Sequence, residues 1–500
     1  MFLIDKADQY GNGIALESDR GVLTYRQLLE RSQTLASDLI TEKNDLEGDR
    51  IVSQLPPSFD YVVLQWAVWQ AGGIFVPLPH DIPNDDLRFL IEDIEPSTII
   101  VEKGSLDTVL PFTGRDRVKT MDEYNTDSVK DLPSINNDRP CMLLYTSGTT
   151  GKPKGVVISH LNLEAQITSL QEAWGWTKQD KTVLTLPLYH VHGIVNILCC
   201  ALASGATCRI HSRFDPQAVW NEFRKGDISL FMAVPTIYAK LMEWYDDVNK
   251  DEQRNLSKAV SNLRLTVSGS APLSTSLFDR WYEISGHKML ERYGMTETGM
   301  ILSNPLDGER RKGSVGQPLP GVSMKLVDEQ QQEIAPGEPG EILVKGKVVF
   351  SKYWRRPDET EASFHNGWFR TGDLSVEEDG YYRLLGRLNQ DIIKTGGHKV
   401  SALEIEEMLR EHPDINDATV VSIHDDVWGE VICAAVIPRI KLLSEDSILE
   451  WSENKFINHK RPRRVFIMSD FPRNNLGKVI KSELREMFEK SSEVESDDNT

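Results

Sequence analysis

The chain is poor in cysteine, with five in 500 residues, and the number is odd. No CxxC pair and no Cys/His spacing typical of a metal site is present. Most of the cysteines lie in apolar runs, where cysteine behaves as a small hydrophobic residue. This usage favours a reducing compartment over a disulfide framework.

A segment long enough to span a bilayer is also lacking. The longest apolar stretch, 194–206, has thirteen residues and is interrupted by Asn196, whereas a spanning helix needs about 20. The N-terminal MFLIDKADQYGNG resembles neither a secretory signal nor an Arg/Ser-rich transit peptide, and the final Asp-Asn-Thr is no peroxisomal address. We therefore expect a cytoplasmic protein with no membrane insertion.

The third feature that the chain lacks is an excess of basic residues. The chain has 56 Lys and Arg against 76 Asp and Glu, a formal net charge of −20. This balance argues against non-specific binding to nucleic acid or to an anionic membrane, although local basic pockets remain compatible with it. Hydrophobic residues make up 40% and charged residues 26%, as in ordinary folded proteins, and the length corresponds to roughly three domains.

Strands and helices alternate in the first 140 residues. Between Asp49 and Leu78 an apolar IVSQL is followed by a helical YVVLQWAVWQA, a Gly-Gly break and IFVPL. A strand, a helix and a strand at this spacing predict a βαβ unit with parallel strands. The same order recurs around 181–209 and 228–267. The sequence therefore predicts parallel α/β sheets in this part of the chain.

The pattern changes twice further along the chain. In 315–385 short alternating runs, separated by Gly, Pro and Asp, predict antiparallel strands. After Gly386 the capping box Ser401-Ala-Leu-Glu404 predicts a helix that runs to about Glu411. Two strands and a further helix are expected after it, at 418–423, at 431–437 and from about Ser447.

The strongest local signal is the string YTSGTTGKPKG at 145–155, which follows an apolar strand at 142–144. Its three glycines, four Ser and Thr hydroxyls and two lysines offer the N–H groups, hydroxyl donors and cations that a polyphosphate needs. It is no Walker A loop, because Pro153 follows Gly151-Lys152. On composition alone, a flexible surface turn is the alternative.

The whole string resembles the phosphate loop of the adenylate-forming superfamily, which includes acyl-CoA synthetases, peptide-synthetase adenylation domains and beetle luciferase. The resemblance extends from about Leu23 to Leu484. Together with the loop, eight segments match in the family's order and leave little room for another family. The other seven are LPLYH at 186–190, SGSAPL at 268–273, YGMTE at 293–297, GWFRTGD at 367–373, GR at 386–387, DIIKTGG at 391–397 and PRNNLGK at 472–478.

The resemblance implies a fold that combines α/β and α+β parts. A large N-terminal AMP-binding domain, 1–388, would carry parallel α/β sheets and a distorted antiparallel β-barrel. A hinge at 389–391 would lead to a small mobile α+β domain, 392–487. The remaining 488–500 are acidic and polar and are expected to form a disordered tail.

The hinge segment departs from the family's pattern. Members usually place a hinge Asp or Lys two residues after the Arg of the Gly-Arg pair, and a later Lys six after that Arg. Here Lys394 is seven residues after Arg387, so the segment is one residue longer. The pivot therefore lies at Asn389, Gln390 or Asp391, and the sequence does not distinguish among them.

The activity that the resemblance implies is ATP-dependent ligation of a carboxylic acid to coenzyme A. The carboxylate attacks the α-phosphate of ATP to give acyl-adenylate and diphosphate, and the thiol of coenzyme A then displaces AMP. Neither step needs an enzyme nucleophile, so catalysis consists of positioning and of neutralising developing charge. The expected cofactors are ATP, Mg²⁺ and coenzyme A as co-substrate.

Carried over residue by residue, the resemblance assigns the ATP site. Thr296 would contact the α-phosphate and Glu297, with Thr150, would bind Mg²⁺, a hard ion that prefers oxygen. Tyr293 would stack on adenine, and Asp373 would accept both ribose hydroxyls. Without the resemblance, the alternative for Tyr293 is a core aromatic and the alternative for Asp373 is a turn residue. The residues expected to bind ATP or AMP are Thr146, Ser147, Gly148, Thr149, Thr150, Gly151, Lys154, Gly269, Ser270, Ala271, Glu291, Tyr293, Gly294, Met295, Asp373 and Arg387.

For the acid, the resemblance places His190 beside the substrate carboxylate, with His192 and Ser268 nearby. We expect His190 at the end of an apolar strand, with His192 on the same side only if the alternation continues; no third ligand suggests zinc. Arg292 could pair bidentately with a second carboxylate, or form a salt bridge to Glu291 or Glu297. The strings LPLYHVHGIVN, ERYGMTETGM and DIIKTGGHKVSALEIE look most like malonyl-CoA synthetases, so the expected substrate is malonate or methylmalonate.

Four further positions concern coenzyme A and the change between the two half-reactions. Lys394, Gly396 and Gly397 would line the coenzyme A channel, because glycine lets backbone approach a narrow ligand closely. A plain hairpin turn is the alternative. Lys478 would be catalytic, reaching the acyl carboxylate and α-phosphate in the first half-reaction; by residue type alone it would be a surface lysine.

Other functions remain open at this point. One is ligation of another short-chain or aromatic acid, and a second is a catalytically inactive nucleotide-binding homologue. A third is an adenylation module that loads a carrier protein. The chain contains no downstream carrier domain, which favours free coenzyme A. The expected partner is a small carboxylic acid, with no nucleic acid, and the oligomeric state, monomer or dimer, is not predicted.

Overall fold

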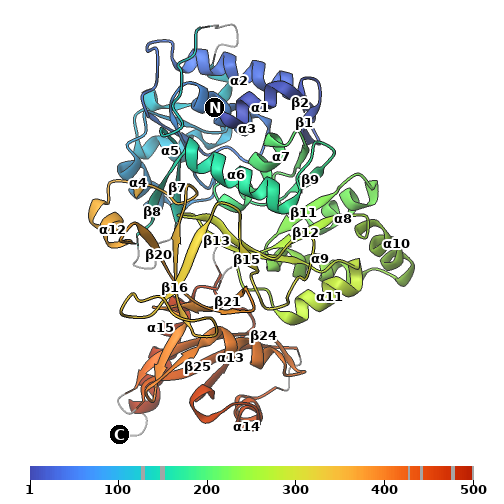
Figure 1. The fold of residues 1–500 in the computed structure, drawn as a ribbon, viewed down its shortest axis with the longest axis vertical. Helices are drawn as coiled ribbons and strands as arrows, with labels where there is room; N and C mark the ends of the chain where they lie inside the picture. Colours follow the sequence, from blue (N-terminus) through green and yellow to red (C-terminus); the bar gives the residue numbers. More distant parts are fainter. Residues whose placement is uncertain (125–129, 147–151, 426–427, 440–442, 474–478, 498–500) are drawn as a thin grey trace.

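The computed structural model describes residues 1–124, 130–146, 152–425, 428–439, 443–473 and 479–497. Within these residues a large N-terminal domain contains three sheets, and a smaller C-terminal domain contains one. Figure 1 shows the smaller domain, in orange and red, at one end of the molecule beside the antiparallel strands β16 (Ser323–Val327) and β21 (Tyr381–Arg387). The predicted mixture of parallel α/β sheets and an α+β C-terminal domain is confirmed.

One sheet of the large domain has the strand order β18-β8-β7-β4-β3-β5-β6. Its centre is parallel, and the predicted βαβ unit is present: β3 and β4 pair in parallel and α3 connects them. Ser58 caps α3 by accepting a hydrogen bond from the Tyr61 N–H at 3.2 Å, as expected of a helix start. The elements are β3 (Arg50–Ser53), α3 (Phe59–Gln70), β4 (Ile74–Pro77), α4 (Asn84–Ile94), β5 (Thr98–Ile100), α5 (Leu106–Val109), β6 (Val118–Lys119), β7 (Pro140–Thr146), β8 (Lys154–Ser159) and β18 (Lys352–Tyr353).

A second sheet has the order β15-β14-β13-β12-β11-β9-β10-β1-β2. In this order the six neighbouring strands β13-β12-β11-β9-β10-β1 pair in parallel, and β2, β14 and β15 are antiparallel additions at the edges. This confirms the parallel strands expected around 181–209 and 228–267. The strands are β1 (Ile14–Ser18), β2 (Gly21–Thr24), β9 (Lys181–Leu184), β10 (Thr207–Ile210), β11 (Leu230–Ala233), β12 (Leu265–Ser268), β13 (Leu290–Met295), β14 (Gly299–Ser303) and β15 (Gln317–Pro318).

Helices pack around this second sheet, and one of them corrects an expectation. The strand expected to end at His190 stops at Leu184, and His190 lies in a turn before the π-helix η6 (His192–Cys199). His190 and His192 therefore do not alternate along a strand. Short apolar runs do not distinguish a strand from a buried helix. The α-helices are α1 (Phe2–Ala7), α2 (Tyr25–Leu39), α6 (His160–Trp174), α7 (Cys200–Ala203), α8 (Pro216–Lys225), α9 (Pro235–Asp247), α10 (Lys250–Val260) and α11 (Thr275–Ser285).

The antiparallel strands expected in 315–385 form a third sheet in the order β16-β17-β20-β19, with β21 paired to β20. The register of β20 and β21 sets Asp373 opposite Arg387. The further elements are β17 (Gly340–Lys345), α12 (Pro357–Ala362), β19 (Phe364–His365) and β20 (Trp368–Glu378). Short 3₁₀ turns occur at Asp8–Tyr10, Lys103–Ser105, Leu110–Phe112, Arg115–Arg117, Met121–Glu123 and Asn458–Lys460.

The C-terminal domain has its own sheet and hydrophobic core. The strand order is β23-β22-β25-β24, with β26 on β25, and Ile405, Leu409 and Val420 are among the fully buried core residues. Ser401 caps α13, as predicted, by accepting from the Glu404 N–H at 3.2 Å. The elements are β22 (Ile392–Thr395), β23 (His398–Ser401), α13 (Ala402–Arg410), β24 (Ile415–Asp425), β25 (Gly429–Pro438), α14 (Glu445–Lys455), β26 (Arg464–Ile467) and α15 (Lys481–Asp497).

The tail expectation is wrong for most of its length. The backbone of α15 is helical to Asp497, so the disorder expected for 488–500 does not apply to 488–497. Leu484 and Phe488 are buried, and Phe488 packs edge-on against Phe466 at 4.1 Å between ring centroids. The acidic composition of the last residues did not indicate this packing, because the apolar residues that pack lie before the acidic run. No helix in the described part of the chain combines the length and apolar character that a bilayer-spanning segment needs.

Candidate active site

Three residues expected to bind the nucleoside come together between two sheets. The Tyr293 hydroxyl on β13 donates to one carboxylate oxygen of Asp373 on β20, and Arg387 Nε on β21 lies 3.2 Å from the other. Burial and the Asp373 carboxylate raise the pKa of Tyr293 well above its usual value, so its hydroxyl stays protonated. Burial alone would lower the pKa of Arg387, but the neighbouring acids, with Asp373 first, raise it.

The turn between β13 and β14 carries Thr296 and Glu297. Glu297 is buried, and its Oε1 accepts a hydrogen bond from the Tyr353 hydroxyl at 2.8 Å. Burial raises the pKa of Glu297, and this hydrogen bond opposes that shift. Thr296 lines a cavity together with Val191, Val195 and Phe350. Gly294 and Met295 precede the turn on β13 and are half-buried.

The flanks of the predicted phosphate loop are held by strand pairing. Thr146, the last residue of β7, pairs with Lys154, the first residue of β8. The residues between these ends that were predicted to hold phosphate, namely Ser147, Gly148, Thr149, Thr150 and Gly151, lie outside the described residues. Thr146 and Lys154 therefore fix where the segment leaves and rejoins the sheet.

Lys154 has an acidic partner at this position. Its ammonium forms an ion pair with Glu359 on α12 and lies 5.5 Å from the centre of the Tyr353 ring. The Tyr353 hydroxyl in turn bonds to Glu297. The predicted phosphate ligand Lys154 and the predicted metal ligand Glu297 thus contact the same aromatic side chain from two sides.

Ser270, expected along the adenine base, meets two residues expected near the acid, and the three come from different elements. Ser270, in the turn after β12, accepts a hydrogen bond from Arg292 Nη2 at 3.0 Å and lies 3.3 Å from His192 Nδ1. Ser270 has a φ of +71°, in the left-handed region that non-glycine residues rarely adopt. A Cβ on Gly269 would lie 2.8 Å from Arg292 Nε, so glycine is required for this close approach. The SGSAPL turn is therefore shaped around the Arg292 side chain.

Arg292 is a buried cation with unused donors. Its side chain is 2% exposed, and its Nε and Nη1 have no hydrogen-bond partner in the described residues. Burial lowers the pKa of Arg292 to about 9. The alternative of a salt bridge to Glu291 or Glu297 is wrong, since Arg292 forms no ion pair within the described part of the chain. For Glu291 strand alternation explains this, because adjacent residues on β13 point to opposite faces.

Two histidines and a serine lie in the same region with their ring or hydroxyl groups largely out of water. Burial lowers the pKa of His190 to about 4 and that of His192 well below its usual value. Both rings are therefore neutral at pH 7. His192 Nε2 and Ser268 Oγ are buried with no partner in the described residues, so both have unused hydrogen-bonding capacity.

Glu291 behaves differently from the other nucleotide candidates. Its carboxyl group is buried, and burial raises its pKa to about 8. Glu407 on α13 adds to this shift, which places Glu291 toward the C-terminal domain. At pH 7 Glu291 is therefore mostly protonated and can donate a hydrogen bond. Ala271 lies in the same SGSAPL turn and is half-buried.

The predicted coenzyme A residues form the β22–β23 hairpin. Gly396 and Gly397 make its turn, with φ of +54° and +80°. Gly396 N–H donates to the Trp428 carbonyl at 2.9 Å, whereas a Cβ on Gly397 would meet no atom within 4 Å. Lys394 is exposed on β22. This turn is thus an open surface feature of the small domain.

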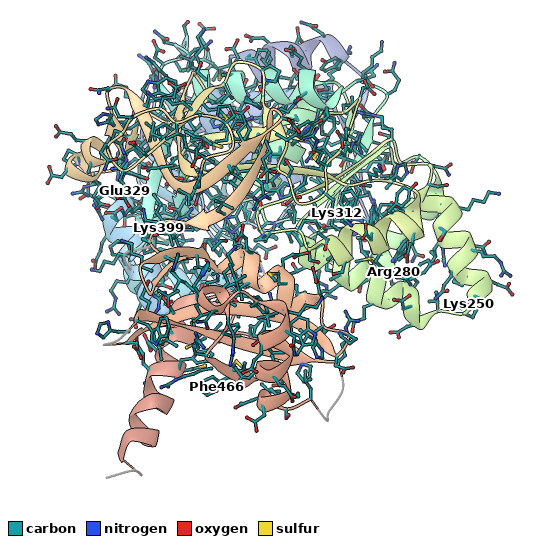
Figure 2. All side chains as sticks on the ribbon, turned by 60° about the horizontal axis from the view of Figure 1, so that its bottom comes forward. Lys250, Arg280, Lys312, Glu329, Lys399 and Phe466 are labelled. Atoms are coloured by element: carbon teal, nitrogen blue, oxygen red, sulfur yellow. The ribbon has the colours of Figure 1, made fainter. Side chains whose placement is uncertain are left out.

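The two domains meet at ion pairs and at the predicted hinge. Figure 2 shows Lys399 of the small domain beside Glu329 of the large one, and they form an ion pair. The Thr275 N–H of α11 donates to Glu407 at 2.9 Å. Within the hinge, Asn389 is exposed and Gln390 half-buried, while Asp391 accepts from the Arg387 N–H at 3.0 Å. Lys478 lies outside the described residues.

Sequence patterns did not find Tyr353, Glu359 or Lys481. Tyr353 reaches the site because β18 pairs with β8, more than 190 residues earlier, and Glu359 follows it on α12. No local sequence motif predicts such a long-range strand pairing. Lys481 opens α15, where its ammonium contacts both Asp391 and Glu406.

Comparison with known proteins assigns the chain to a family. Residues 3–354 match the model of the AMP-binding enzyme family, and residues 404–478 match that of the AMP-binding enzyme C-terminal domain. The chain belongs to the AMP-binding enzyme family. A mouse (Mus musculus) relative named malonate–CoA ligase ACSF3, mitochondrial, is 40% identical over 96% of this chain and 89% of its own length.

Solved structures agree on the fold. ATP-bound MatB from Rhodopseudomonas palustris superimposes with a TM-score of 0.90 and 31% identity, covering 97% of this chain and 98% of that one. Apo MatB from the same organism, at 32% identity and the same coverage, gives 0.80. The present arrangement is therefore more similar to the ATP-bound structure than to the apo structure.

Proposed function

We propose that this protein is an ATP-dependent, AMP-forming acid–CoA ligase whose acid substrate is malonate or methylmalonate. The observation that carries the substrate assignment is Arg292, a buried guanidinium with two unused donors beside the predicted acyl pocket. A monocarboxylate would leave this cation unpaired, which is costly in a buried site. A second carboxylate supplies the missing acceptors. The mouse relative named malonate–CoA ligase supports the same substrate class.

The proposed first half-reaction uses the grouped polar residues described above. Asp373, Arg387 and Tyr293 would hold the nucleoside, with Gly269, Ser270 and Ala271 along the base. Thr296 would contact the α-phosphate, and Lys154 with the loop would hold the β- and γ-phosphates. His190, neutral at pH 7, would border the attacking carboxylate without competing for its charge. Lys478 would neutralise charge at the α-phosphate.

The residues also fit Mg²⁺. Magnesium is usually bound by one or two carboxylates together with substrate phosphates, rather than by a complete protein cage. Glu297 offers one buried carboxylate, and no group of three or more His, Cys, Asp or Glu side chains suited to a metal occurs in the described ranges. Glu297 would therefore hold Mg²⁺ together with the phosphates of ATP, and with Thr150 as predicted. When bound, the ion neutralises phosphate charge.

The proposed domain division follows the sequence prediction. Residues 1–388 would form the AMP-binding domain, 389–391 the hinge and 392–487 the small domain. The small domain would rotate between half-reactions, withdrawing Lys478 and bringing Lys394, Gly396 and Gly397 to the coenzyme A channel. Such alternation orders different groups at one site in turn. The higher TM-score to ATP-bound MatB supports assigning the present arrangement to the first half-reaction.

A diphosphate-release assay with a panel of acids tests the function. Malonate, methylmalonate, oxalate, acetate, butyrate and benzoate are each supplied with ATP and Mg²⁺, with and without coenzyme A, and the thioester is identified by mass spectrometry. We expect kcat/KM to be highest for malonate or methylmalonate, and thioester only when coenzyme A is present. Higher kcat/KM for a monocarboxylate would contradict the substrate, and absence of diphosphate with every acid would indicate an inactive homologue.

We also propose that the protein acts in the cytoplasm. Its five cysteines are all buried and unpaired, which agrees with a reducing compartment. The name of the mouse relative includes a mitochondrial location, so the two compartments are the alternatives. Expression with a C-terminal fluorescent tag, followed by fractionation, separates them.

A further inference from the structure

The stem of the segment that contains Lys478 is fixed by described residues. Val479 bridges Arg473 in an isolated antiparallel pair, and the Ile480 N–H donates to the Pro472 carbonyl at 2.8 Å. Arg473 Nη2 lies 2.9 Å from Asp417 Oδ2 on β24. The next residue after this stem, Lys481, begins α15. The chain therefore enters and leaves 474–478 through a short, tethered stem.

Lys481 is the tether on the outgoing side. Its Nζ lies 2.6 Å from Asp391 Oδ1 and 2.7 Å from Glu406 Oε1. Its side chain is 16% exposed, and that of Glu406 only 5%. Burial alone would lower the pKa of Lys481, but Glu406 and Asp391 raise it, so the ammonium remains charged. Since Glu406 also accepts from the Val420 N–H at 2.9 Å, it ties the ammonium to the core of the small domain.

The second carboxylate oxygen of Asp391, Oδ2, contacts Arg387 on the other side of the hinge. Oδ2 accepts from the Arg387 N–H at 3.0 Å, and the Asp391 N–H donates to the Arg387 carbonyl at 2.8 Å. The Asp391 carbonyl accepts from the Ala402 N–H of the small domain at 2.8 Å. Asp391 is therefore attached to the small domain through its carbonyl and Oδ1, and to the end of β21 through its N–H and Oδ2.

This double attachment restricts where a rotation can occur. If the backbone turns between Leu388 and Gln390, Asp391 can remain on Lys481 and Ala402, but its contacts with Arg387 must change. Arg387 itself holds Asp373 at 3.2 Å. A continuous set of contacts thus connects the base of the Lys478 segment, through Lys481 and Asp391, to the predicted nucleoside site.

The geometry points to Lys481 as a positioning residue that couples the segment carrying Lys478 to the hinge and stabilises the domain arrangement of the first half-reaction. The inference rests on the proposed function and deepens it, because it narrows the pivot within the proposed hinge to Asn389 and Gln390 and assigns Asp391 the contact that holds the arrangement. Lys481 does not touch substrate in this assignment. It orients the Asp391 carboxylate toward the Arg387 N–H.

The test separates the two half-reactions in Lys481→Met, Lys481→Arg and Asp391→Asn. Adenylate formation is measured as diphosphate release without coenzyme A, and thioester formation from presynthesised acyl-adenylate and coenzyme A. We expect Lys481→Met to reduce adenylate formation roughly 5- to 150-fold, the usual range of coupling between sites, with thioester formation changed less than about threefold. Lys481→Arg should recover most of the loss, since it keeps the charge.

Asp391→Asn keeps the test possible if the Lys481→Met variant does not fold. It removes the charge of Asp391 and leaves the Lys481–Glu406 pair, so it should fold even where Lys481→Met does not. It should show the same selective loss, and Lys478→Ala provides the reference for a lesion confined to adenylate formation. Lys455→Met is the control, because Lys455 lies in the same domain, is half-exposed, and pairs with Glu411 at 3.8 Å instead of with a hinge residue.

Parallel losses in both half-reactions, or no loss in either, would overturn the assignment. The wild-type enzyme is measured first with the acid panel, and the variants are compared on whichever acid it adenylates best. A substrate other than malonate would therefore contradict the proposed substrate and leave this test intact.

Discussion

Arg292 Nη2 donates to Ser270 Oγ at 3.0 Å, while Nε and Nη1 of the same guanidinium find no partner in the described residues. One hydrogen bond does not compensate a buried guanidinium for lost hydration. The left-handed φ of Ser270 and the glycine at 269 bring the SGSAPL turn close to the guanidinium, and the two donors without a partner are themselves buried. Such an arrangement is expected where an anion completes the site.

The first prediction follows from these unused donors. Arg292→Met removes the charge and keeps much of the aliphatic volume. We expect kcat/KM for malonate to decrease by a factor between about 30 and several thousand. This range is the equivalent of roughly 2–5 kcal/mol for losing a buried charged partner. Activity with butyrate should change little, because it makes no second charged contact. Comparable losses with both acids would show that Arg292 supports the structure or ATP binding instead.

The second prediction concerns Glu291 and pH. Its pKa is about 8 in the folded protein and near 4.5 when exposed, so the folded state binds one more proton between these values. Stability from this group is complete below about pH 4.5 and is lost as pH rises through 8. Glu291→Gln removes the titration. We expect the melting temperature of the wild type to fall, relative to that of the variant, between pH 5.5 and 8.5.

The size of this effect is on the order of 1–5 kcal/mol, from 1.36 kcal/mol for each pKa unit. Differential scanning calorimetry at several pH values measures it. Glu283→Gln is the matched control, because that carboxylate is exposed and paired with Arg280 on the surface. Equal pH dependence in wild type, variant and control would contradict the raised pKa of Glu291.

The sequence predicted much of the fold because its signals were local. The βαβ unit at 49–78, the Ser401 cap and the strands after it depend on hydrophobic periodicity and capping, which act within a few residues. The acidic tail and the strand at His190 were predicted wrongly for the same reason. Neither the burial of Phe488 against Phe466 nor the π-helix after His190 can be inferred from composition.

The site residues divide in a similar way. Tyr293, Asp373 and Arg387 were proposed through motifs and do meet in the fold. Tyr353, Glu359 and Lys481 belong to none of the matching segments. Tyr353 and Glu359 reach the site through long-range strand pairing and an ion pair, whereas Lys481 reaches the hinge through ion pairs. Side-chain partners across distant elements depend on packing, and a single sequence does not encode that as a local pattern. The partner of Lys154 is one example.

The third prediction concerns that partner. Glu359 forms an ion pair with Lys154, and the two side chains are 39% and 22% exposed. A triphosphate that takes Lys154 must displace this carboxylate. We therefore expect Glu359→Gln to lower KM for ATP by roughly 1.5- to 5-fold, since such half-exposed pairs are worth about 0.2–1 kcal/mol. The maximal rate at saturating ATP should stay close to that of the wild type.

Initial rates across ATP concentrations, at fixed Mg²⁺ and malonate, measure this change. Glu361→Gln is the control, because Glu361 is exposed on the same helix α12. An unchanged or higher KM in Glu359→Gln would show that the ion pair does not compete with the nucleotide. A fall of the same size in the Glu361 variant would attribute the effect to general surface charge.

The fourth prediction tests the β22–β23 turn as part of the coenzyme A channel. Gly397 has a φ of +80° and open space around a would-be Cβ in the present arrangement. A leucine there should clash only when the small domain presents this turn to the site. We expect Gly397→Leu to keep adenylate formation within about threefold and to reduce thioester formation about tenfold or more. Thioester formation should fall because glycine lets the backbone approach a narrow ligand closely, and a leucine side chain would block that approach.

Backbone strain must be separated from steric blockage, because leucine at a positive φ costs roughly 1–2 kcal/mol wherever it occurs. Gly367 provides the matched position. It has a φ of +78°, lies in the turn between β19 and β20, and a Cβ there would likewise meet no atom within 4 Å. Gly367→Leu should lower the melting temperature about as much as Gly397→Leu while leaving both half-reactions intact. If both variants lose thioester formation equally, strain alone explains the loss, and the β22–β23 turn does not line the channel.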